Sequence, residues 1–166
     1  MGVERLDLVY LRIGMMTPPH GESLAERFEA LAALREEGLI RHLGLSNVDA
    51  DHPAEARAIA PVAAVQNLFH IAKQEGRAVL DVCSANGIAF VPFGPIGSGH
   101  SDLNNDRLAK VSARHSATVS QIELAWLLAL SPVTLAIPGT GSVAHLEENM
   151  QAGSIVLAAQ DLVDLG

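Results

Sequence analysis

The chain has 166 residues, of which 49% are hydrophobic and 18% charged, so it is long and apolar enough to bury the core of one domain and is not a disordered protein. Its 19 acidic and 11 basic residues give a formal net charge of -8 without a Lys/Arg cluster, which argues against nucleic acid and membrane surfaces as partners. The single cysteine, Cys83, excludes an internal disulfide, and we expect a cytoplasmic protein because neither a membrane-spanning run nor a signal-peptide layout is found in the sequence.

Five short apolar runs predict β-strands. Most of them end at Gly, Pro, Ser or Asn, as expected of parallel strands that are buried on both faces. Their alternation with helical segments predicts an α/β fold with a parallel sheet, built either as an open doubly wound sheet or as a (β/α) barrel. The five runs cover residues 6–13, 42–47, 62–69, 88–96 and 133–139.

Amphipathic segments between these runs predict helices. In the first segment, Ser23 and Glu26 have the spacing of a capping box and Gly38 ends the helical pattern. Thr118 and Gln121 form a second capping box at the start of a longer apolar helix. No low-complexity linker divides the chain, so we expect one domain over residues 1–166. Further helices are predicted from about Pro53, over about 74–86 and over about 104–115.

Residues 136–149, AIPGTGSVAHLEEN, combine a strand, a glycine turn and a helix start. The glycines fit the G-x-G-x-x-A fingerprint, in which backbone amides approach a pyrophosphate at a helix N-terminus. A Rossmann unit also needs a second parallel strand and an acidic residue about 20 positions later. Asp161 and Asp164 lie at that distance, but they sit in the stretch AAQDLVDLG, which does not have the apolar β-branched run of a second parallel strand before them. The turn therefore either cradles phosphate in another fold or only connects a strand to a helix.

Polar residues recur where the predicted strands end. Ser46 and Asn47 follow one strand, Gln66 and Asn67 interrupt the next, and Thr140 follows the last. Each of them alone fits a turn or a helix cap. In a (β/α) barrel, however, functional side chains collect at the carboxyl ends of the strands, and the recurrence favours that architecture.

Five motifs, in this order and spacing, resemble the second half and more of an aldo-keto reductase. They are GLIRHLGLSN, AVQNLFH, GIAFVPFGPIGSG, ELAWLLA and IPGTGSVAHLEEN. The resemblance covers nearly the whole chain, from the fourth barrel strand onward. It implies a (β/α)8 TIM barrel, of which these residues form a partial barrel of about five parallel strands. It also implies an NADP(H)-dependent oxidoreductase domain that reduces aldehydes or ketones to alcohols, with NAD(H) as the alternative cofactor.

The resemblance assigns cofactor-binding residues motif by motif. Ser46, Asn47 and Gln66 match residues that hydrogen-bond the nicotinamide carboxamide, which suits side chains that can both donate and accept. Phe93 matches an aromatic ring stacked under the nicotinamide, with a core position as its other interpretation. The pyrophosphate loop corresponds to Gly94, Pro95, Ile96 and Gly97 within the stretch 94–99, and the adenosine 2'-phosphate and adenine site to Gly139, Thr140, His145, Glu148 and Asn149.

Two departures bear on the choice of cofactor. Many family members have Lys at the position of Gly139 and Arg at that of His145, so this chain offers fewer fixed positive charges to a 2'-phosphate. Backbone amides, the Thr140 hydroxyl and the helix start at Ser142 would have to compensate. The NADP(H) preference is therefore inherited from the family alone.

The catalytic residues depart further from the family. Its general acid is a Tyr assisted by Lys and Asp on the first three strands, and no position of this chain matches them. Tyr10 is the one tyrosine, and its place inside the strand LDLVYLRI predicts packing. Arg12 stands at or beside the place of a fourth-strand His that orients the carbonyl in many members. We expect Arg12 either to polarise a carbonyl or bind an acidic substrate, or to be a salt-bridge partner.

Three functions remain open at this point. The first is a carbonyl-reducing oxidoreductase with a small-molecule substrate, the second a non-catalytic nucleotide-binding fragment or partner module of the same fold, and the third an unrelated phosphate-binding α/β domain. We also expect self-association through open barrel edges. A metal site is not expected, because the histidines lack ligand spacing. They are His20, His42, His52, His70, His100, His115 and His145.

Overall fold

The computed structural model describes residues 2–14, 21–97 and 106–166. The chain forms two compact units over these residues. Unit 1 consists of residues 1–67 and 76–91, and unit 2 of residues 68–75 and 92–166, each over its described part. The described residues do not include His20 or His100. They also do not include positions 98 and 99, the last two of the stretch 94–99 in which the pyrophosphate loop was predicted.

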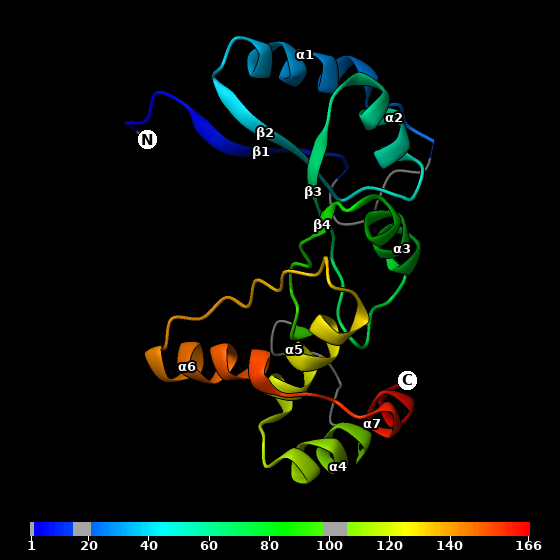
Figure 1. Cartoon of the computed structure of the whole chain (residues 1–166), viewed down its shortest axis with the longest axis vertical. Helices are drawn as coiled ribbons and strands as arrows, with labels where there is room; N and C mark the ends of the chain where they lie inside the picture. Colours follow the sequence, from blue (N-terminus) through cyan, green and yellow to red (C-terminus); the bar gives the residue numbers. More distant parts are fainter. Residues whose placement is uncertain (1, 15–20, 98–105) are drawn as a thin grey trace. The chain divides into compact units, whose positions relative to one another are not determined.

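Unit 1 is a parallel sheet with helices between its strands, as predicted. The strands follow one another in the order β1-β2-β3-β4, and each pair is parallel. The helices flank the sheet (Figure 1). The strands are β1 (Leu6–Arg12), β2 (Ile40–Ser46), β3 (Val62–Gln66) and β4 (Ala89–Phe90), and the helices are α1 (Ala25–Glu36), α2 (His52–Ile59) and α3 (Arg77–Asn86).

The core of unit 1 follows from the two-residue period of its strands. Leu43, Leu45 and Val65 have no accessible surface, and Phe28 of α1 and Leu80 of α3 are buried with them. Side chains that alternate with these along a strand point to the opposite face of the sheet. Each strand therefore places its buried apolar residues on one face of the sheet. The residues that alternate with them lie on the opposite face, including at the carboxyl ends of the strands.

The start of α1 differs from the predicted capping box. Leu24 is its N-cap residue, and no side chain of the cap position accepts a hydrogen bond. Instead, the Glu55 carboxylate of α2 accepts hydrogen bonds from the Leu24 amide at 3.3 Å and from the Ser23 hydroxyl. The capping-box prediction for Ser23 and Glu26 was therefore wrong: the helix begins after Leu24 rather than after Ser23, and the Ser23 hydroxyl accepts from the Ala25 amide at 3.2 Å and donates to Glu55.

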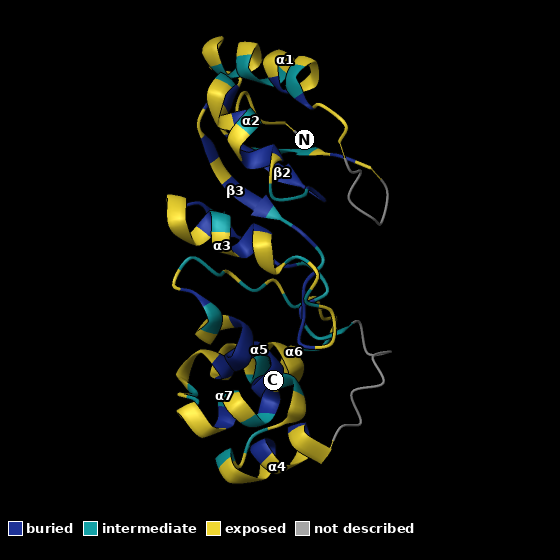
Figure 2. Ribbon diagram, turned by 90° about the vertical axis from the view of Figure 1, so that its right-hand side faces the viewer, coloured by how far each residue is buried: buried dark blue, intermediate teal, exposed yellow. Residues whose placement is uncertain are grey.

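Unit 2 is helical around α5. The predicted capping box at its start is confirmed: the Gln121 amide donates to Thr118 Oγ1 at 3.3 Å, and the Thr118 amide donates to Gln121 Oε1 at 2.9 Å. Trp126 of α5 stacks on Phe69 with ring centroids 6.0 Å apart. Figure 2 shows the buried α5 among more exposed helices. The unit contains α4 (Asp106–His115), α5 (Val119–Leu130), α6 (Val143–Gln151), a 3-10 turn over Ala152–Ser154 and α7 (Ala159–Leu165).

The fifth predicted strand, residues 133–139, forms no named strand among the described residues. Leu135 and Ile137 are 59% and 40% exposed, so this run does not have the burial of a central parallel strand. Pro132 precedes the run and Pro138 lies within it, and neither has the amide hydrogen that a sheet ladder needs. Over the residues that the structure describes, four strands, rather than about five, make up the sheet.

Asp161 and Asp164, which have the spacing of a ribose-binding acid, hold α7 against α4 instead. Arg114 lies 3.1 Å from Asp161 Oδ1 and also pairs with Asp164, while His115 Nε2 lies 2.8 Å from Asp161 Oδ2. The hydrogen bond with His115, followed by the one from the Ala158 amide, lowers the pKa of Asp161. These contacts give both acids a structural role within unit 2.

No helix in the described ranges has the length and apolarity that crossing a membrane requires.

Candidate functional site

Three of the predicted site residues lie in one row across the sheet of unit 1. The strand register pairs Arg12 with Ser46, and Ser46 with Gln66, at the carboxyl ends of β1, β2 and β3. Arg12 Nη1 donates a hydrogen bond to Ser46 Oγ at 3.2 Å. Residues paired in register point to the same face of a sheet, and neighbouring strands lie about 4.8 Å apart. The row thus brings a guanidinium, a hydroxyl and an amide side by side.

Asn47 ends β2 in a different way. Its backbone is left-handed, with a φ of 58°, and its amide donates to the Gln66 carbonyl at 3.0 Å. Its side-chain Nδ2 donates to the Ile13 carbonyl at 2.7 Å. Asn is one of the few side-chain residues that adopt this backbone conformation readily. Asn47 therefore ties the ends of three neighbouring strands, and its Nδ2 already has a protein partner.

Asn67 is a structural residue whose partner could not be predicted from the sequence. Its Oδ1 accepts from the Val48 amide at 3.0 Å, and its Nδ2 donates to the Val48 carbonyl at 2.6 Å. With 4% of its surface exposed, Asn67 satisfies two backbone groups that would otherwise be buried without partners. Asn67 thereby holds the chain that follows Ser46 and Asn47. The sequence feature that pointed to Asn67 was the polar pair Gln66 and Asn67 at the end of one predicted strand.

Tyr10 packs inside the sheet, as predicted. It pairs with Gly44 in the strand register, and a Cβ atom at Gly44 would lie 2.7 Å from the Tyr10 ring and 2.9 Å from the Ala64 carbonyl oxygen. The ring therefore occupies the space that the glycine leaves. Burial raises the pKa of Tyr10, which makes its phenol a poorer acid than an exposed one.

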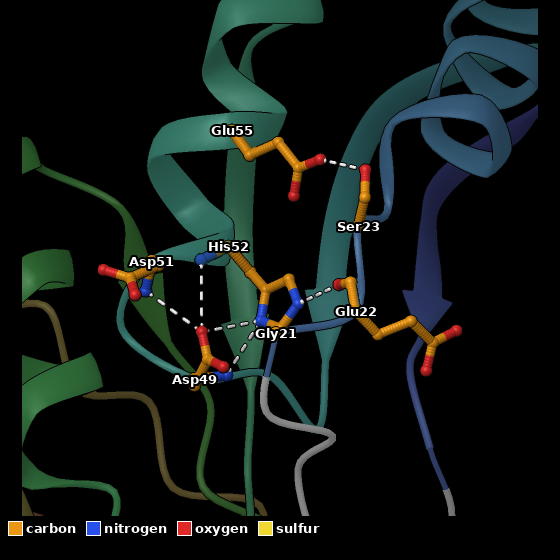
Figure 3. Close-up of a pocket in the computed structure, with 7 residues that line it drawn as sticks. All are labelled: Gly21, Glu22, Ser23, Asp49, Asp51, His52 and Glu55. Carbon is orange, nitrogen blue, oxygen red and sulfur yellow. Dashed lines mark hydrogen bonds and ion pairs between the residues drawn. The ribbon is translucent and has the colours of Figure 1, made fainter.

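A polar pocket of about 250 Å³ lies where α1 and α2 begin (Figure 3). His52 connects the two segments: Nε2 lies 2.8 Å from the Glu22 carbonyl oxygen, and Nδ1 lies 2.8 Å from Asp49 Oδ1 and 3.1 Å from the Asp49 amide nitrogen. Asp49 Oδ1 also accepts from the Asp51 amide at 3.1 Å. The cluster fixes the chain after Asn47 by hydrogen bonds. Within the described ranges, no group of His, Cys, Asp and Glu side chains has the geometry of a metal site.

Unit 2 gathers six of the predicted cofactor residues around one pocket of about 260 Å³. The pocket lies between the start of α5, the glycine turn and the start of α6. The remaining lining residues, Thr118, Val119 and Ser120, belong to the first turn of α5, and sequence reasoning missed them although the capping box had located that turn. The six predicted residues are Ile96, Gly139, Thr140, His145, Glu148 and Asn149.

The turn in this pocket is held by short-range hydrogen bonds. Thr140 Oγ1 accepts from the Ser142 amide at 3.1 Å, and Ser142 Oγ accepts from the His145 amide at 3.4 Å, so Ser142 is the N-cap of α6. The first amides of a helix have no partner within the helix, and its N-terminus carries a partial positive charge. None of the nine lining residues is Lys or Arg, and His145 is the one base among them.

The predicted pyrophosphate loop forms a tight turn. Gly94 and Gly97 have φ values of 62° and 61°, which favour glycine, and the Gly97 amide donates to the Gly94 carbonyl at 3.0 Å. Pro95 is buried and Phe93 is half-buried. The Phe93 carbonyl accepts from the Phe69 amide at 3.4 Å. These contacts hold Phe93 at the start of the turn.

A family model described as "Aldo/keto reductase family" matches residues 1–165 of this chain. Pyridoxine 4-dehydrogenase of Escherichia coli (strain K12) is 44% identical over 168 residues, which cover 99% of this chain and 58% of that protein. An uncharacterized oxidoreductase of Schizosaccharomyces pombe is 42% identical over 161 residues, covering 96% of this chain and 51% of that protein. The chain thus spans a little more than half the length of these relatives.

Solved structures agree with this match. A thermostable aldo-keto reductase in complex with epalrestat superimposes with a TM-score of 0.85 at 31% identity, over 98% of this chain and 59% of that one. An aldo-keto reductase from Klebsiella pneumoniae in complex with NADPH gives a TM-score of 0.81 at 29% identity, over 98% and 58%. These neighbours are (β/α)8 barrels, so the parallel sheet of unit 1 is part of a partial barrel of that class. The chain belongs to the aldo/keto reductase family.

Proposed function

We propose that the pocket of unit 2 binds the adenosine 2'-phosphate end of NADP(H), and that a whole protein of the length of the relatives, of which this chain spans a little more than half, uses this cofactor to reduce aldehydes or ketones to alcohols. The observation that carries the proposal is the gathering of six predicted residues around one pocket of about 260 Å³. Two relatives support NADP(H) over NAD(H): the Klebsiella pneumoniae enzyme is in complex with NADPH, and a Schizosaccharomyces pombe relative is named an aldo-keto reductase [NADP(+)].

The donors at this pocket suit a phosphate without a fixed cation. The Thr140 hydroxyl and the first amides of α6 are neutral donors at the positive end of a helix, where anions are stabilised. His145 adds a positive charge when it is protonated. Glu148 and Asn149, one turn later on α6, offer a carboxylate and an amide to the donors and acceptors of adenine.

Unit 1 supplies the residues for the nicotinamide end. Ser46 and Gln66 lie in one row, and their hydroxyl and amide groups match the donors and the acceptor of a carboxamide. Asn47 contributes there through its side-chain oxygen, because its Nδ2 is bonded to the Ile13 carbonyl. When bound, the reduced nicotinamide supplies the hydride. In unit 2, Phe93 offers an aromatic face, and the turn of Gly94, Pro95, Ile96 and Gly97 offers the backbone amides of Gly94 and Ile96 to a pyrophosphate, since Pro95 has no amide hydrogen and the Gly97 amide donates to the Gly94 carbonyl.

Small carbonyl compounds are the proposed substrates, and Arg12 orients them. Two relatives are named for such compounds: pyridoxine 4-dehydrogenase at 44% identity and the methylglyoxal reductase DkgB of Escherichia coli O157:H7 at 30% identity. A guanidinium next to the carboxamide-binding Ser46 can donate a hydrogen bond to a carbonyl oxygen. We include pyridoxal and pyridoxine among the proposed substrate and product pairs.

A non-catalytic nucleotide-binding module is the second candidate. The observation that favours it is the position of Tyr10, the one tyrosine of the sequence, which packs over Gly44 inside the sheet. Residues 1–166 therefore offer no tyrosine that matches the family's general acid. In this alternative the pocket of unit 2 binds the cofactor, and no reduction follows.

Exposed apolar side chains on α6 and just before it support self-association. On α6, Val143 and Met150 are each 72% exposed and Leu146 is 51% exposed, and Leu135 and Ile137 precede them in the chain. Large exposed apolar groups that lie close together commonly mark surfaces that another chain covers. Sedimentation velocity should show an average mass that rises with protein concentration, and a monomer at all concentrations would contradict this part of the proposal.

Calorimetric titration of NADPH into residues 1–166 tests the cofactor proposal. We expect saturable binding, displaced by adenosine 2',5'-bisphosphate and far less by adenosine 5'-monophosphate, because the 2'-phosphate provides the charged contact. Thr140→Ala should weaken NADPH binding by about three- to ten-fold, the value of one hydrogen bond. Ser154→Ala, an exposed position on the 3-10 turn outside the pocket, is the matched control and should leave binding unchanged. No saturable binding would contradict the proposal.

A further inference from the structure

The pocket of unit 2 has walls on two different helices, α5 and α6. We propose that Gln121 of α5, which does not line the pocket, positions these walls against each other and so sets the affinity for the nucleotide. Gln121 is thus a positioning residue, which acts on the ligand through α6. The inference rests on the proposed function, because it concerns the same pocket. The lining residues on the two helices are Thr118, Val119 and Ser120 at the start of α5, and His145, Glu148 and Asn149 on α6.

Gln121 uses both ends of its side-chain amide. Its Oε1 accepts from the Thr118 amide at 2.9 Å, which completes the capping box of α5. Its Nε2 donates to the Glu148 carbonyl at 3.0 Å and to Gln151 Oε1 at 3.2 Å, and both acceptors belong to α6. With 7% of its surface exposed, Gln121 is shielded from water that could replace these bonds. The side chain therefore ties the start of α5 to the C-terminal half of α6.

The Glu148 carbonyl lies where the regular hydrogen-bond pattern of α6 changes. The Ala152 amide, four positions later, donates instead to the Asn149 and Met150 carbonyls. Carbonyl groups in the last turn of a helix need partners from outside the helix or from water. Gln121 Nε2 is such a partner for Glu148, so the bond between the helices also satisfies a backbone group of α6.

Apolar packing contributes little to holding α6 in place. None of its nine residues is buried, and it packs mainly on α5 and on the 3-10 turn that follows it. Its larger apolar side chains, Val143, Leu146 and Met150, are exposed. In α5, by contrast, residues 121–127 are all buried. Loss of the Gln121 donor should therefore loosen α6 far more than α5, because most helical stability in proteins comes from packing.

The position of α6 matters because side chains from both helices have to meet the ligand at once. A pocket whose walls are fixed before binding loses less conformational freedom when the ligand binds. If α6 occupies its binding position only part of the time, the apparent affinity falls by that fraction. Gln121 thus controls the binding of the nucleotide without touching it.

Two matched substitutions separate the hydrogen bond from the effect of charge. Gln121→Glu keeps an oxygen for the Thr118 amide, and Glu is a usual partner of Thr in a capping box, so the start of α5 is preserved. It replaces the Nε2 donor by an acceptor, which repels the Glu148 carbonyl and Gln151 Oε1. Gln151→Glu, the control, adds the same charge across the same 3.2 Å contact but keeps the donor and an acceptor in place. Only Gln121→Glu should therefore release α6.

Hydrogen exchange of the ligand-free 166-residue chain at pH 8 measures the release of α6. The amides of α6 should exchange at least about ten-fold faster in Gln121→Glu than in the parent, whereas those of residues 121–127 should keep the parent's rates. Gln151→Glu should exchange as the parent does. In the double variant Gln121→Glu, Gln151→Lys, an ammonium group donates to the new carboxylate, and most of the protection of α6 should return.

Calorimetric titration with adenosine 2',5'-bisphosphate measures the consequence for the ligand. We expect Gln121→Glu to bind at least about five-fold more weakly than the parent, and Gln151→Glu to bind within about two-fold of the parent. The double variant should bind more tightly than Gln121→Glu. If the thermal melt shows that Gln121→Glu does not fold, Gln151→Leu takes its place. This variant removes one of the two acceptors without adding charge, and it should weaken binding by about two- to three-fold.

The outcomes separate this inference from the proposed function. Equal exchange of α6 in the parent and Gln121→Glu, or equal weakening of binding by Gln121→Glu and Gln151→Glu, would overturn the role of Gln121. Equal binding by the parent and Gln121→Glu would also overturn it, and would leave Gln121 as a helix cap alone. If exchange of α6 depends on Gln121 but the bisphosphate does not bind to the parent, the positioning of α6 stands and the proposed function fails.

Discussion

The predicted cofactor residues of the two units are held in place by different means. In unit 1, Ser46 and Asn47 are each 2% exposed, and hydrogen bonds to the neighbouring strands fix them. In unit 2, Thr140 and His145 are exposed, and the turn that carries them is held by bonds between residues two or three positions apart. Substitutions in unit 1 should therefore act mainly on folding, and substitutions in the unit 2 pocket mainly on binding. The substitutions of Gly44, Gly139 and His145 below test this difference.

The largest expected effect concerns activity. Residues 1–166 alone should not reduce an aldehyde with NADPH, although we expect them to bind the cofactor, because Tyr10 lies over Gly44 and cannot serve as the family's general acid. A positioned general acid is worth about 10² to 10⁴ in rate. The absorbance of NADPH at 340 nm with pyridoxal as substrate measures this, and turnover at rates usual for enzymes would contradict the prediction.

The next largest effect is a pH dependence of the stability of unit 2, which arises from a residue outside the pocket. Burial raises the pKa of Glu123 in α5 from 4.5 to about 7, so the folded protein holds its proton more tightly than the unfolded chain does. The contribution of Glu123 is most favourable below pH 4.5, is lost as the pH rises to about 7, and is constant above that. The loss amounts to on the order of 3 kcal/mol.

Urea unfolding at pH 5 and pH 8 measures this contribution. Glu123→Gln should remove most of the difference between the two pH values and should be more stable than the parent at pH 8. Glu29→Gln, at an exposed position of α1, is the control and should behave as the parent does. An identical pH dependence in the parent and Glu123→Gln would show that the carboxyl group is solvated.

Two glycine substitutions compare the units directly. A Cβ at Gly44 would lie 2.7 Å from Tyr10 and 2.9 Å from a backbone oxygen, whereas a Cβ at Gly139 would meet no atom within 4 Å. Gly44→Ala should therefore lower the free energy of unfolding by about 1 to 3 kcal/mol. Gly139→Ala should change it by less than about 0.5 kcal/mol. Denaturant unfolding measures both, and equal effects would contradict the account of Tyr10 and Gly44.

The smallest effect is expected in cofactor preference. Replacing His145 by Ala should weaken NADPH binding by about ten-fold while leaving NADH binding nearly unchanged, since one charge-assisted contact is lost. His145→Arg should strengthen NADPH binding selectively. If the ratio of the two dissociation constants is the same in all three proteins, His145 does not contact the phosphate.

Local patterns predicted the parts of the fold that depend on local sequence. The apolar runs and the residues that end them located β1, β2 and β3, and Thr118 and Gln121 located the start of α5. The cap of α1 could not be predicted, because Glu55 acts from 31 positions beyond Leu24. The run 133–139 has the composition of a strand, but a strand also needs paired neighbours, which composition does not specify.

The candidate site shows the same limit. Family motifs named six residues of the unit 2 pocket, and the structure brings them together. The motifs could not show that Gln66 and Asn67, which are adjacent in the sequence, have different roles. The strand register places Gln66 in the row with Ser46, whereas Asn67 forms hydrogen bonds with Val48. A side chain that forms hydrogen bonds with backbone groups far away in the sequence leaves no pattern that a single sequence can reveal.

The glycine turn and the first turn of α6 are proposed to bind the 2'-phosphate of NADP(H). The most direct test is the backbone amide spectrum of residues 1–166, recorded by nuclear magnetic resonance during titration with adenosine 2',5'-bisphosphate or adenosine 5'-monophosphate. We predict that the amides of Thr140, Ser142 and His145 shift saturably with the bisphosphate and much less with the monophosphate, while that of Asn67 in unit 1 does not move. Equal shifts with both nucleotides, or shifts confined to residues outside 139–149, would contradict the claim.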